Sequence, residues 1–213
     1  DEAILPARGG NWYDNRGYID MHYHTWTKDH GGTGSVWNWL STTIGTTNQA
    51  ISILEANIPA STTTKAQNIS ELKMVRAIAY FMMMDMYGNV PIYTDYGDFT
   101  PKTNSPRAEV FKFIESEVNA ALPNLSVETG VSTYGRANKW TAYALLAKVS
   151  LYQKKWQEVI DNCDKVTGYS LVSDYSLQYK KEGEFGPESI FEINGIGGTS
   201  SPGFGIGNYT VSQ

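Results

Sequence analysis

The sequence contains a single cysteine, Cys163, among its 213 residues. One cysteine cannot form a disulfide within the chain, and it cannot supply the several thiolates of a cysteine-rich zinc site. The sequence therefore excludes the small disulfide-rich proteins and the zinc fingers.

Long apolar runs and clusters of basic residues are also missing. No stretch reaches the roughly 18 consecutive apolar residues that a membrane-spanning helix needs. The net charge is −5, and no run of Lys or Arg is present to neutralise a phosphate backbone. We therefore expect no membrane-spanning helix and no nucleic-acid partner.

Apolar material for a core is present, since hydrophobic residues make up 41% of the chain. That amount is enough for one globular domain with a core of its own. We expect residues 1–213 to be a single domain. Because the chain begins without Met and ends without a structural stop signal, we also expect it to be part of a longer protein.

Residues 1–34 are rich in Gly, Asn, Asp and aromatic side chains and show no sustained period. A long segment without a period is typical of an irregular surface loop. Its aromatic content is higher than that of disordered chains. We predict an ordered, irregular segment.

Apolar residues spaced by three and four positions predict a helical region over residues 36–168. Ser105 with Pro106 after it is the pattern of an N-cap followed by the first helical residue. Gly88 and Gly168 stand where C-terminal caps are expected. The predicted helices cover about residues 37–58, 70–87, 106–121, 137–153 and 156–167.

The helix that begins near Ser70 is apolar on nearly all sides, which predicts a central position in the fold. Four of its side chains could form a soft-metal site or a hydrophobic groove, but deformable core packing is favoured. These are Met82, Met83, Met84 and Met86.

Charged residues on the same helix need partners if they face inward. Arg76 and Asp85 are the two candidates, and Arg136 farther along the chain is a third. We predict that these charges have structural roles.

The last two predicted helices are joined only by residues 153–155, so they must pack antiparallel. The small residue Ala147 occupies a position of close approach, as in a tetratricopeptide hairpin. The second helix has apolar residues at inward spacing: Trp156, Val159, Ile160 and Cys163.

Residues 169–213 are rich in loop-forming residues. The run from Ser189 to Ile193 is strand-like, and a glycine-rich tail follows it. These glycines fit neither the dinucleotide-binding nor the P-loop pattern. We predict turns there, and no nucleotide site.

Four stretches of the chain, taken together, resemble the SusD/RagB family. Two of them are the most specific: Tyr87-Gly88-Asn89-Val90-Pro91, and Gly135-Arg136-Ala137 before the Ala144-Leu145-Leu146-Ala147-Lys148 helix. The other two are residues 8–14 with 24–27, and Pro106-Arg107 with Val110-Phe111 and Leu122-Pro123.

The resemblance implies a mostly α fold of tetratricopeptide-like helical hairpins with long irregular loops and minor β structure. It implies a lipoprotein on the outer membrane of Bacteroidetes that binds oligosaccharides or polysaccharides and has no catalytic centre and no cofactor. The implied partner is a SusC-like, TonB-dependent transporter, and the membrane is reached only through a lipid anchor outside this chain.

The strongest candidate for glycan binding is Trp12 with Asp14 and Asn15. A sugar presents apolar C–H faces and polar hydroxyl edges, so an aromatic ring beside carboxylate and amide groups suits it. In the family, a Trp and an Asn three residues later contribute to the glycan site, and Trp12 and Asn15 have that spacing. The alternative is that Trp12 packs the loop onto the helices. The resemblance makes Tyr209 a second, weaker candidate.

Two other kinds of site are less favoured. His22, His24 and His30 lie near Asp20, but they lack a complete metal-ligand signature, and we predict structural or surface roles for them. A glycosidase would need two carboxylates across a cleft, and loops carry candidates. These are Asp14, Asp20, Asp95 and Asp98. No nucleophile motif accompanies them, so we do not expect an enzyme.

A protein-interaction scaffold is the alternative function, because tetratricopeptide surfaces commonly bind peptide segments. A glycan-binding protein should expose Trp12 on its irregular face. A scaffold should carry its exposed residues along the helices of residues 137–167.

Overall fold

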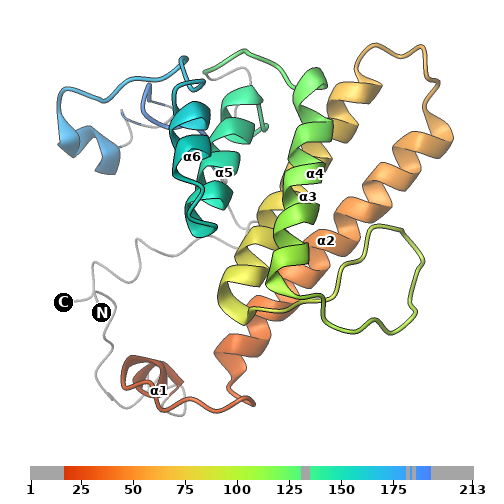
Figure 1. The fold of residues 1–213 in the computed structure, drawn as a ribbon, viewed down its shortest axis with the longest axis vertical. Coiled ribbons are helices and arrows are strands. Elements are labelled where there is room, and N and C mark those ends of the chain that lie inside the picture. The colour runs from red at the N-terminus through yellow and green to blue at the C-terminus, as the bar shows by residue number, and fades with distance from the viewer. Residues whose placement is uncertain (1–16, 131–134, 181–182, 184–185, 193–213) are drawn as a thin grey trace. The chain divides into compact units, whose positions relative to one another are not determined.

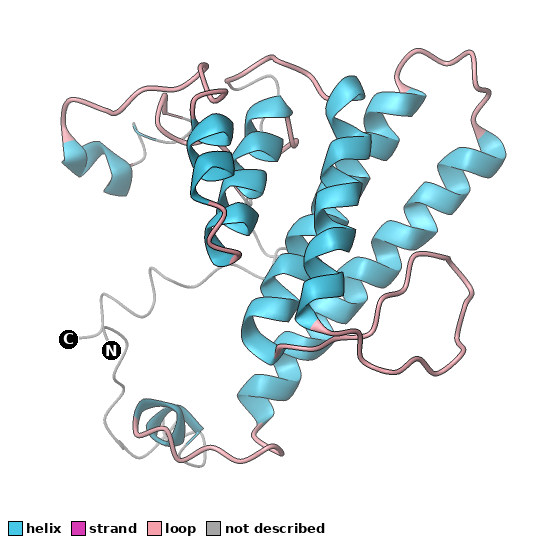
Figure 2. Ribbon diagram, viewed as in Figure 1, coloured by secondary structure: helices cyan, strands magenta, loops and turns pink. Residues whose placement is uncertain are grey.

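The structure is a computed structural model that describes residues 17–130, 135–180, 183 and 186–192 (Figure 1). Its helices are α1 (Gly17–His22), α2 (Gly31–Asn57), α3 (Lys65–Tyr87), α4 (Arg107–Ala121), α5 (Lys139–Tyr152) and α6 (Trp156–Cys163). Short 3-10 helices are η2 (Leu122–Asn124) and η4 (Tyr175–Tyr179). Outside the helices, an antiparallel bridge joins Val90 to Ser105. The expected mostly helical fold is confirmed (Figure 2).

The chain divides into two compact units. One consists of Asp1–Trp39 and Asn194–Gln213, and the other of Leu40–Ile193. The boundary falls inside α2. The packing described below, from Leu40 onward, belongs to the second unit.

The predicted irregular N-terminal segment contains helical structure. Helix α1 lies within it, and α2 begins at Gly31, six residues before the predicted start at Trp37. Within its first turn, the Ser35 hydroxyl donates to the Gly31 carbonyl at 2.8 Å. This turn is made of glycines and polar residues without an apolar period, so the sequence pattern did not predict it.

Helix α3 is the central helix, as predicted. It packs along α4 and also contacts α5. Met74 and Ala77 are fully buried, and Tyr80 is 1% exposed. The predicted cap at Gly88 is confirmed, because its φ is 79° and its N–H donates to Met84 O at 2.9 Å.

Most of the α3 methionines are core residues. Met83 and Met84 are buried, and Met82 is half-buried. Met86 is 59% exposed, so the prediction of core packing is wrong at that position. Met86 lies one residue before the end of α3 at Tyr87.

Helix α4 buries one face against α3. The sequence predicted this face from the spacing of Phe111, Ile114, Val118 and Ala121, and all four are buried. Val110 is fully buried as well. Steps of three and four place these side chains on one stripe of the helix.

The start of α4 differs from the prediction. Pro106 is the N-cap residue, and Ser105 lies one position before it in the bridge to Val90. The first helical N–H, that of Arg107, instead donates to Asn89 Oδ1 at 3.1 Å. The side chain of Asn89 therefore takes the capping role that the sequence assigned to Ser105.

Helix α5 begins at Lys139, two residues later than predicted, because Asn138 is its N-cap. Asn138 Oδ1 accepts from Thr141 N at 2.9 Å, and Thr141 Oγ1 accepts from Asn138 N at 3.3 Å. This reciprocal pair is a capping box. It fixes the backbone between residue 137 and the first turn of α5.

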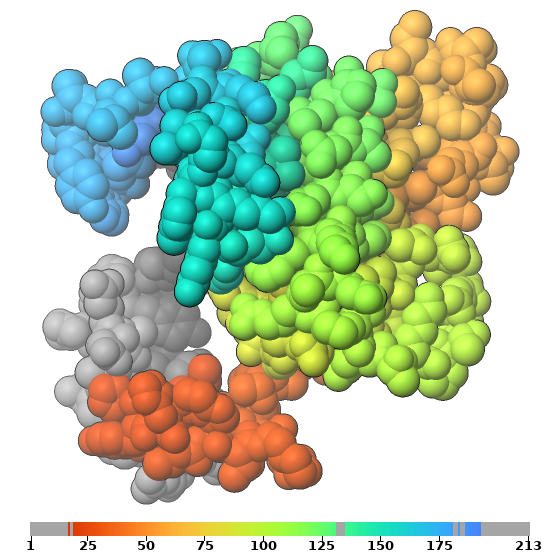
Figure 3. Space-filling model, in the orientation of Figure 1, coloured from red at the N-terminus to blue at the C-terminus, as the bar shows by residue number. Residues whose placement is uncertain are grey.

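Helices α5 and α6 form the predicted hairpin, and Ala147 is buried as expected. The predicted inward face of α6 is wrong. Trp156 is 59% exposed and Ile160 is 54% exposed, Cys163 is exposed, and only Val159 is half-buried. None of the described elements covers the outer side of α6, which reaches the surface in Figure 3.

The C-terminal end of the helical region also departs from the prediction. Helix α6 ends at Cys163, and its C-cap is Asp164, so Gly168 does not cap it. Residues 189–192 of the strand-like run are described, and they form no strand. A strand needs a paired neighbour, and the described part of the chain offers none there.

Candidate functional site

The residues predicted to bind glycan lie outside the described part of the chain. They are Trp12, Asp14, Asn15 and Tyr209. Their roles therefore stay predictions.

The histidines near that segment make local contacts. His30 Nδ1 accepts from Gly32 N at 3.1 Å, which places the ring proton on Nε2, 3.1 Å from Gly17 O. His30 therefore links α1 to the first turn of α2. The ring of His24 packs edge-to-face on Trp26, with centroids 5.2 Å apart. Among the described residues, no group of three His, Cys, Asp or Glu side chains is placed to hold a metal ion.

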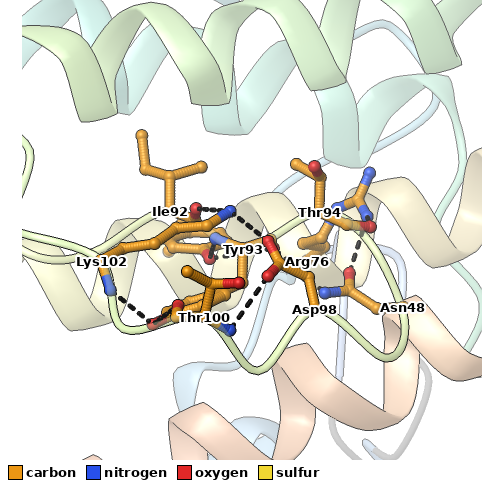
Figure 4. Close-up of polar contacts among 9 residues, drawn as sticks. Asn48, Arg76, Ile92, Tyr93, Thr94, Asp98, Thr100 and Lys102 are labelled. Atoms are coloured by element: carbon orange, nitrogen blue, oxygen red, sulfur yellow. Dashed lines mark hydrogen bonds and ion pairs between the residues drawn. The ribbon is translucent and has the colours of Figure 1, made fainter.

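Residues 88–106 connect α3 to α4, and we call them the α3–α4 loop. A cluster of polar side chains on the neighbouring helices binds this loop. At its centre is Arg76 of α3, whose side chain is 6% exposed. Arg76 Nε donates to Glu117 of α4 at 2.7 Å, and its NH1 group donates to Asn48 of α2 at 2.7 Å. NH1 also donates to the carbonyl of Thr94 at 3.1 Å (Figure 4). The expected inward charge with a partner is confirmed.

Asp85, the other charged residue singled out on α3, is exposed. Arg136 pairs with Glu71 of α3 at 2.8 Å. The predicted structural pairing therefore holds for both arginines. Asp85 is solvated by water, and a side-chain hydrogen bond also joins it to Tyr152.

Tyr80 is a second anchor for the α3–α4 loop. Its hydroxyl accepts from Tyr93 N at 2.7 Å and donates to Tyr93 O at 3.1 Å. Asn48 Nδ2 donates to the same carbonyl at 3.0 Å. The N–H and the carbonyl of Tyr93 are thus both hydrogen-bonded to side chains of α2 and α3. These bonds take the place of the backbone hydrogen bonds that a neighbouring strand would supply.

Burial raises the pKa of Tyr80 to about 12. The ordinary value is about 10, so above pH 10 the unfolded chain loses this proton while the folded protein retains it. The stabilisation is present below pH 10 and is lost as the pH rises toward 12. We expect Tyr80 to contribute a fall of about 1 kcal/mol in unfolding free energy between about pH 8 and about pH 11.

The measurement is urea unfolding at both pH values for the wild type and Tyr80→Phe. Phenylalanine cannot ionise, so the variant should show a smaller decrease with pH, although its baseline stability is lower. Equal decreases in the two proteins would contradict the assignment.

In the outer part of the α3–α4 loop, Lys102 contacts three other residues of the loop. Its Nζ lies 2.9 Å from the Asp98 carboxylate, donates to Ile92 O at 3.2 Å, and lies 4.7 Å from the centre of the Tyr93 ring (Figure 4). The hydrogen bond from Lys102, with that from the Thr100 N–H, lowers the pKa of Asp98 to about 2. Asp98 therefore stays ionised at neutral pH, whereas a general acid must carry a proton.

The tip of the same loop is exposed and aromatic. Phe99 is 87% exposed and Tyr96 is 55% exposed. Gln49 of α2 donates to the Tyr96 hydroxyl at 3.1 Å. The loop therefore has a fixed base and an open tip, an arrangement that the sequence did not reveal because its anchors come from three helices.

A cavity of about 350 Å³ lies beside the N-terminus of α5, and we call it the α5 cavity. Its lining includes charged, polar and aromatic side chains. Six of them are Arg136, Asn138, Tyr169, Ser189, Phe191 and Glu192. Sequence reasoning missed the cavity, since its walls come from segments about 50 positions apart. One indication of this region was present in the sequence, Arg136 in the Gly135-Arg136-Ala137 motif.

The described residues contain no helix that combines the length and the apolar character needed to cross a membrane.

A family model described as "starch-binding associating with outer membrane", SusD-like, matches residues 6–151. A SusD-like protein of Bacteroides ovatus is 27% identical over 217 aligned positions, which cover 91% of this chain and 39% of that protein. SusD-like protein P25 of Formosa agariphila is 21% identical, over 83% of this chain and 37% of that protein.

Solved structures agree with these matches. A laminarin-binding SusD-like protein is 27% identical with a TM-score of 0.79, covering 87% of this chain and 42% of that one. The chain thus spans about two fifths of the length of the relatives it matches. Because the family model covers most of the chain and the helical fold agrees, this chain belongs to the SusD-like family, a family of carbohydrate-binding proteins associated with the outer membrane.

Proposed function

We propose that this chain is part of a cell-surface protein that captures glycans and delivers them to a TonB-dependent, SusC-like transporter. The single observation that carries the proposal is the match of residues 6–151 to the starch-binding family. The likeness to a laminarin-binding protein supports the same ligand class.

The proposed site consists of Trp12, Asp14 and Asn15, with Tyr209 as a further contact. The first three fall within the matched residues 6–151. The indole of Trp12 would stack on a sugar face while the carboxylate and amide bond to hydroxyl groups. One stacked ring contributes about 1 kcal/mol. Affinity for a short oligosaccharide should therefore be roughly micromolar to millimolar, which suits a protein that must release its ligand.

The mechanism is reversible binding without chemistry on the glycan. The family description names binding, not a reaction. Of the loop carboxylates considered for a glycosidase, Asp98 is held ionised by Lys102. A pair of carboxylates in hydrolysis needs one member that carries a proton at working pH.

Isothermal calorimetry with laminarin and starch-derived oligosaccharides tests the proposal. Trp12→Ala should weaken binding of the preferred glycan about fivefold, or by about 1 kcal/mol, without a change in melting temperature. Trp156→Ala is the matched control, because Trp156 is 59% exposed on α6 and is not in the proposed site. Binding that is equally strong in Trp12→Ala would refute the site. A wild-type protein that binds no glycan, in its longer natural form, would refute the function.

A protein-interaction scaffold is the second candidate, and one observation favours it. The helices of residues 137–167 carry exposed apolar side chains: Leu151, Tyr152, Trp156 and Ile160. The two functions are compatible, because one surface can bind the transporter while another binds glycan. If Trp156→Ala prevented co-purification with the transporter and left glycan binding intact, the glycan-binding and the scaffold functions would both be supported.

A further inference from the structure

We propose that the α5 cavity is a second carbohydrate pocket, which takes a short, uncharged piece of glycan. The choice of ligand class rests on the proposed function. The argument for the pocket uses only lining residues that the structure describes, which lie between Thr129 and Glu192.

The volume of the cavity sets the size of its ligand. About 350 Å³ is at the low end of the roughly 300–1,000 Å³ usual for small-molecule pockets. A cavity of this size suits the end of a glycan chain and excludes a bulky polymer segment.

The lining offers what a sugar needs. Tyr169 and Phe191 supply aromatic surface for C–H faces, and the side chains of Ser189 and Glu192 supply oxygen acceptors. Arg136 supplies donors. Its NH2 group bonds to Asn68 at 2.9 Å and to Glu71 at 2.8 Å. Its Nε and NH1 groups make no hydrogen bond to any residue that the structure describes.

Hydroxyl groups both donate and accept, so a pocket that pairs Arg136 donors with Glu192 and Ser189 oxygens can satisfy neighbouring hydroxyls on one ring. A purely apolar ligand would leave these groups without partners, which costs free energy. The lining therefore favours a polyhydroxylated ligand over a hydrophobic one.

The charges on the lining argue against an acidic ligand. The positive charge of Arg136 is already paired with Glu71, whose side chain is 13% exposed. Glu192 adds a negative charge to the same lining. A sulfate or uronic acid group would meet no uncompensated cation, so the pocket suits neutral sugars.

The wall of the pocket is fixed before a ligand arrives. Asn138, which is 4% exposed, donates through Nδ2 to the Tyr169 hydroxyl at 2.9 Å and to Glu128 O at 3.2 Å. The Tyr169 hydroxyl in turn donates to Ile190 O at 3.3 Å. The hydroxyl of this lining residue is therefore already used, which leaves the Tyr169 ring as the part available to a ligand. A wall held this way loses little conformational entropy on binding.

The experiment follows amide chemical shifts of the whole chain by NMR during titration with glucose, maltose and laminaribiose. Sugar at millimolar concentration should move the signals of cavity residues, including Tyr169 and Phe191. Ser189→Trp, which fills the space, should weaken this binding at least about tenfold. Ser189→Ala removes the hydroxyl but keeps the space open, so it should weaken binding by a smaller factor than Ser189→Trp. Glu192→Gln should weaken binding by a smaller factor, because it keeps an amide oxygen.

Two results would overturn the proposal: cavity signals that no sugar moves at tens of millimolar, and shifts that persist undiminished in a folded Ser189→Trp protein. The same titration in Trp12→Ala separates the two sites. Cavity shifts that survive in Trp12→Ala support the second pocket even if the first site is wrong. Glycan binding that Trp12→Ala removes completely, with unmoved cavity signals, would leave only the proposed function standing.

Discussion

Replacement of Arg76 by alanine is expected to lower the free energy of unfolding by about 3–5 kcal/mol, the usual cost of breaking a buried ion pair by removing one partner. Glu117, whose side chain is 12% exposed, would be left as a buried charge without its cation. Asn48 Oδ1 and the carbonyl of Thr94 would also lose their donor. For a chain of this size the melting temperature should fall by roughly 10 °C.

Circular dichroism during heating measures this effect, and Lys155→Ala is its control. Lys155 pairs with Glu115 of α4, and the two side chains are 37% and 25% exposed. Water can reach this pair and Gln153 still donates to Glu115, so the expected cost is only about 1 kcal/mol or less. If the two variants melted at the same temperature, burial would not be what gives the Arg76 cluster its strength.

Ile114→Ala is expected to cost about 2–5 kcal/mol, the range for removal of a buried aliphatic side chain. Ile114 is fully buried on the face of α4 that packs along α3. The loss combines the transfer free energy of the missing methyl and methylene groups with the cavity that they leave. Neighbours such as Val110 and Val118 are themselves fully buried and cannot easily move into that space.

Ile160→Ala is the matched control for Ile114→Ala, because it makes the same chemical change at a side chain that is 54% exposed. We expect its effect on urea unfolding to be within about 0.5 kcal/mol. A large cost at Ile160 would mean that the outer face of α6 is covered in solution. A negligible cost at Ile114 would mean that the α3–α4 interface is not the core.

The helices could be predicted because their packing is periodic. The spacing of Phe111, Ile114 and Val118 alone predicted the buried face of α4, and these side chains are buried. The same reasoning failed on α6, where Trp156 and Ile160 have the spacing of an inward face. Spacing tells which side chains share a face, and only the neighbouring elements decide whether that face is covered.

The helix ends and the residues that anchor the α3–α4 loop could not be predicted from the sequence, for a different reason. The sequence indicated Ser105 as the N-cap of α4, but Ser105 pairs with Val90 in a bridge. The first helical N–H is instead bonded by Asn89, which is 18 positions away in the sequence. Likewise, Arg76 was recognisable as a buried charge in need of a partner. Its partner Glu117 could not be chosen without knowing that α3 lies beside α4.

The Arg76 cluster also bears on the order in which the protein folds. The hairpin of α5 and α6 forms from contacts close in sequence, which close quickly because the entropy of a short loop is small. The cluster joins Arg76 to Asn48, 28 positions away, and to Glu117, 41 positions away. We therefore expect the α3–α4 loop to gain its fixed path late in folding, after the helices that carry its anchors have met.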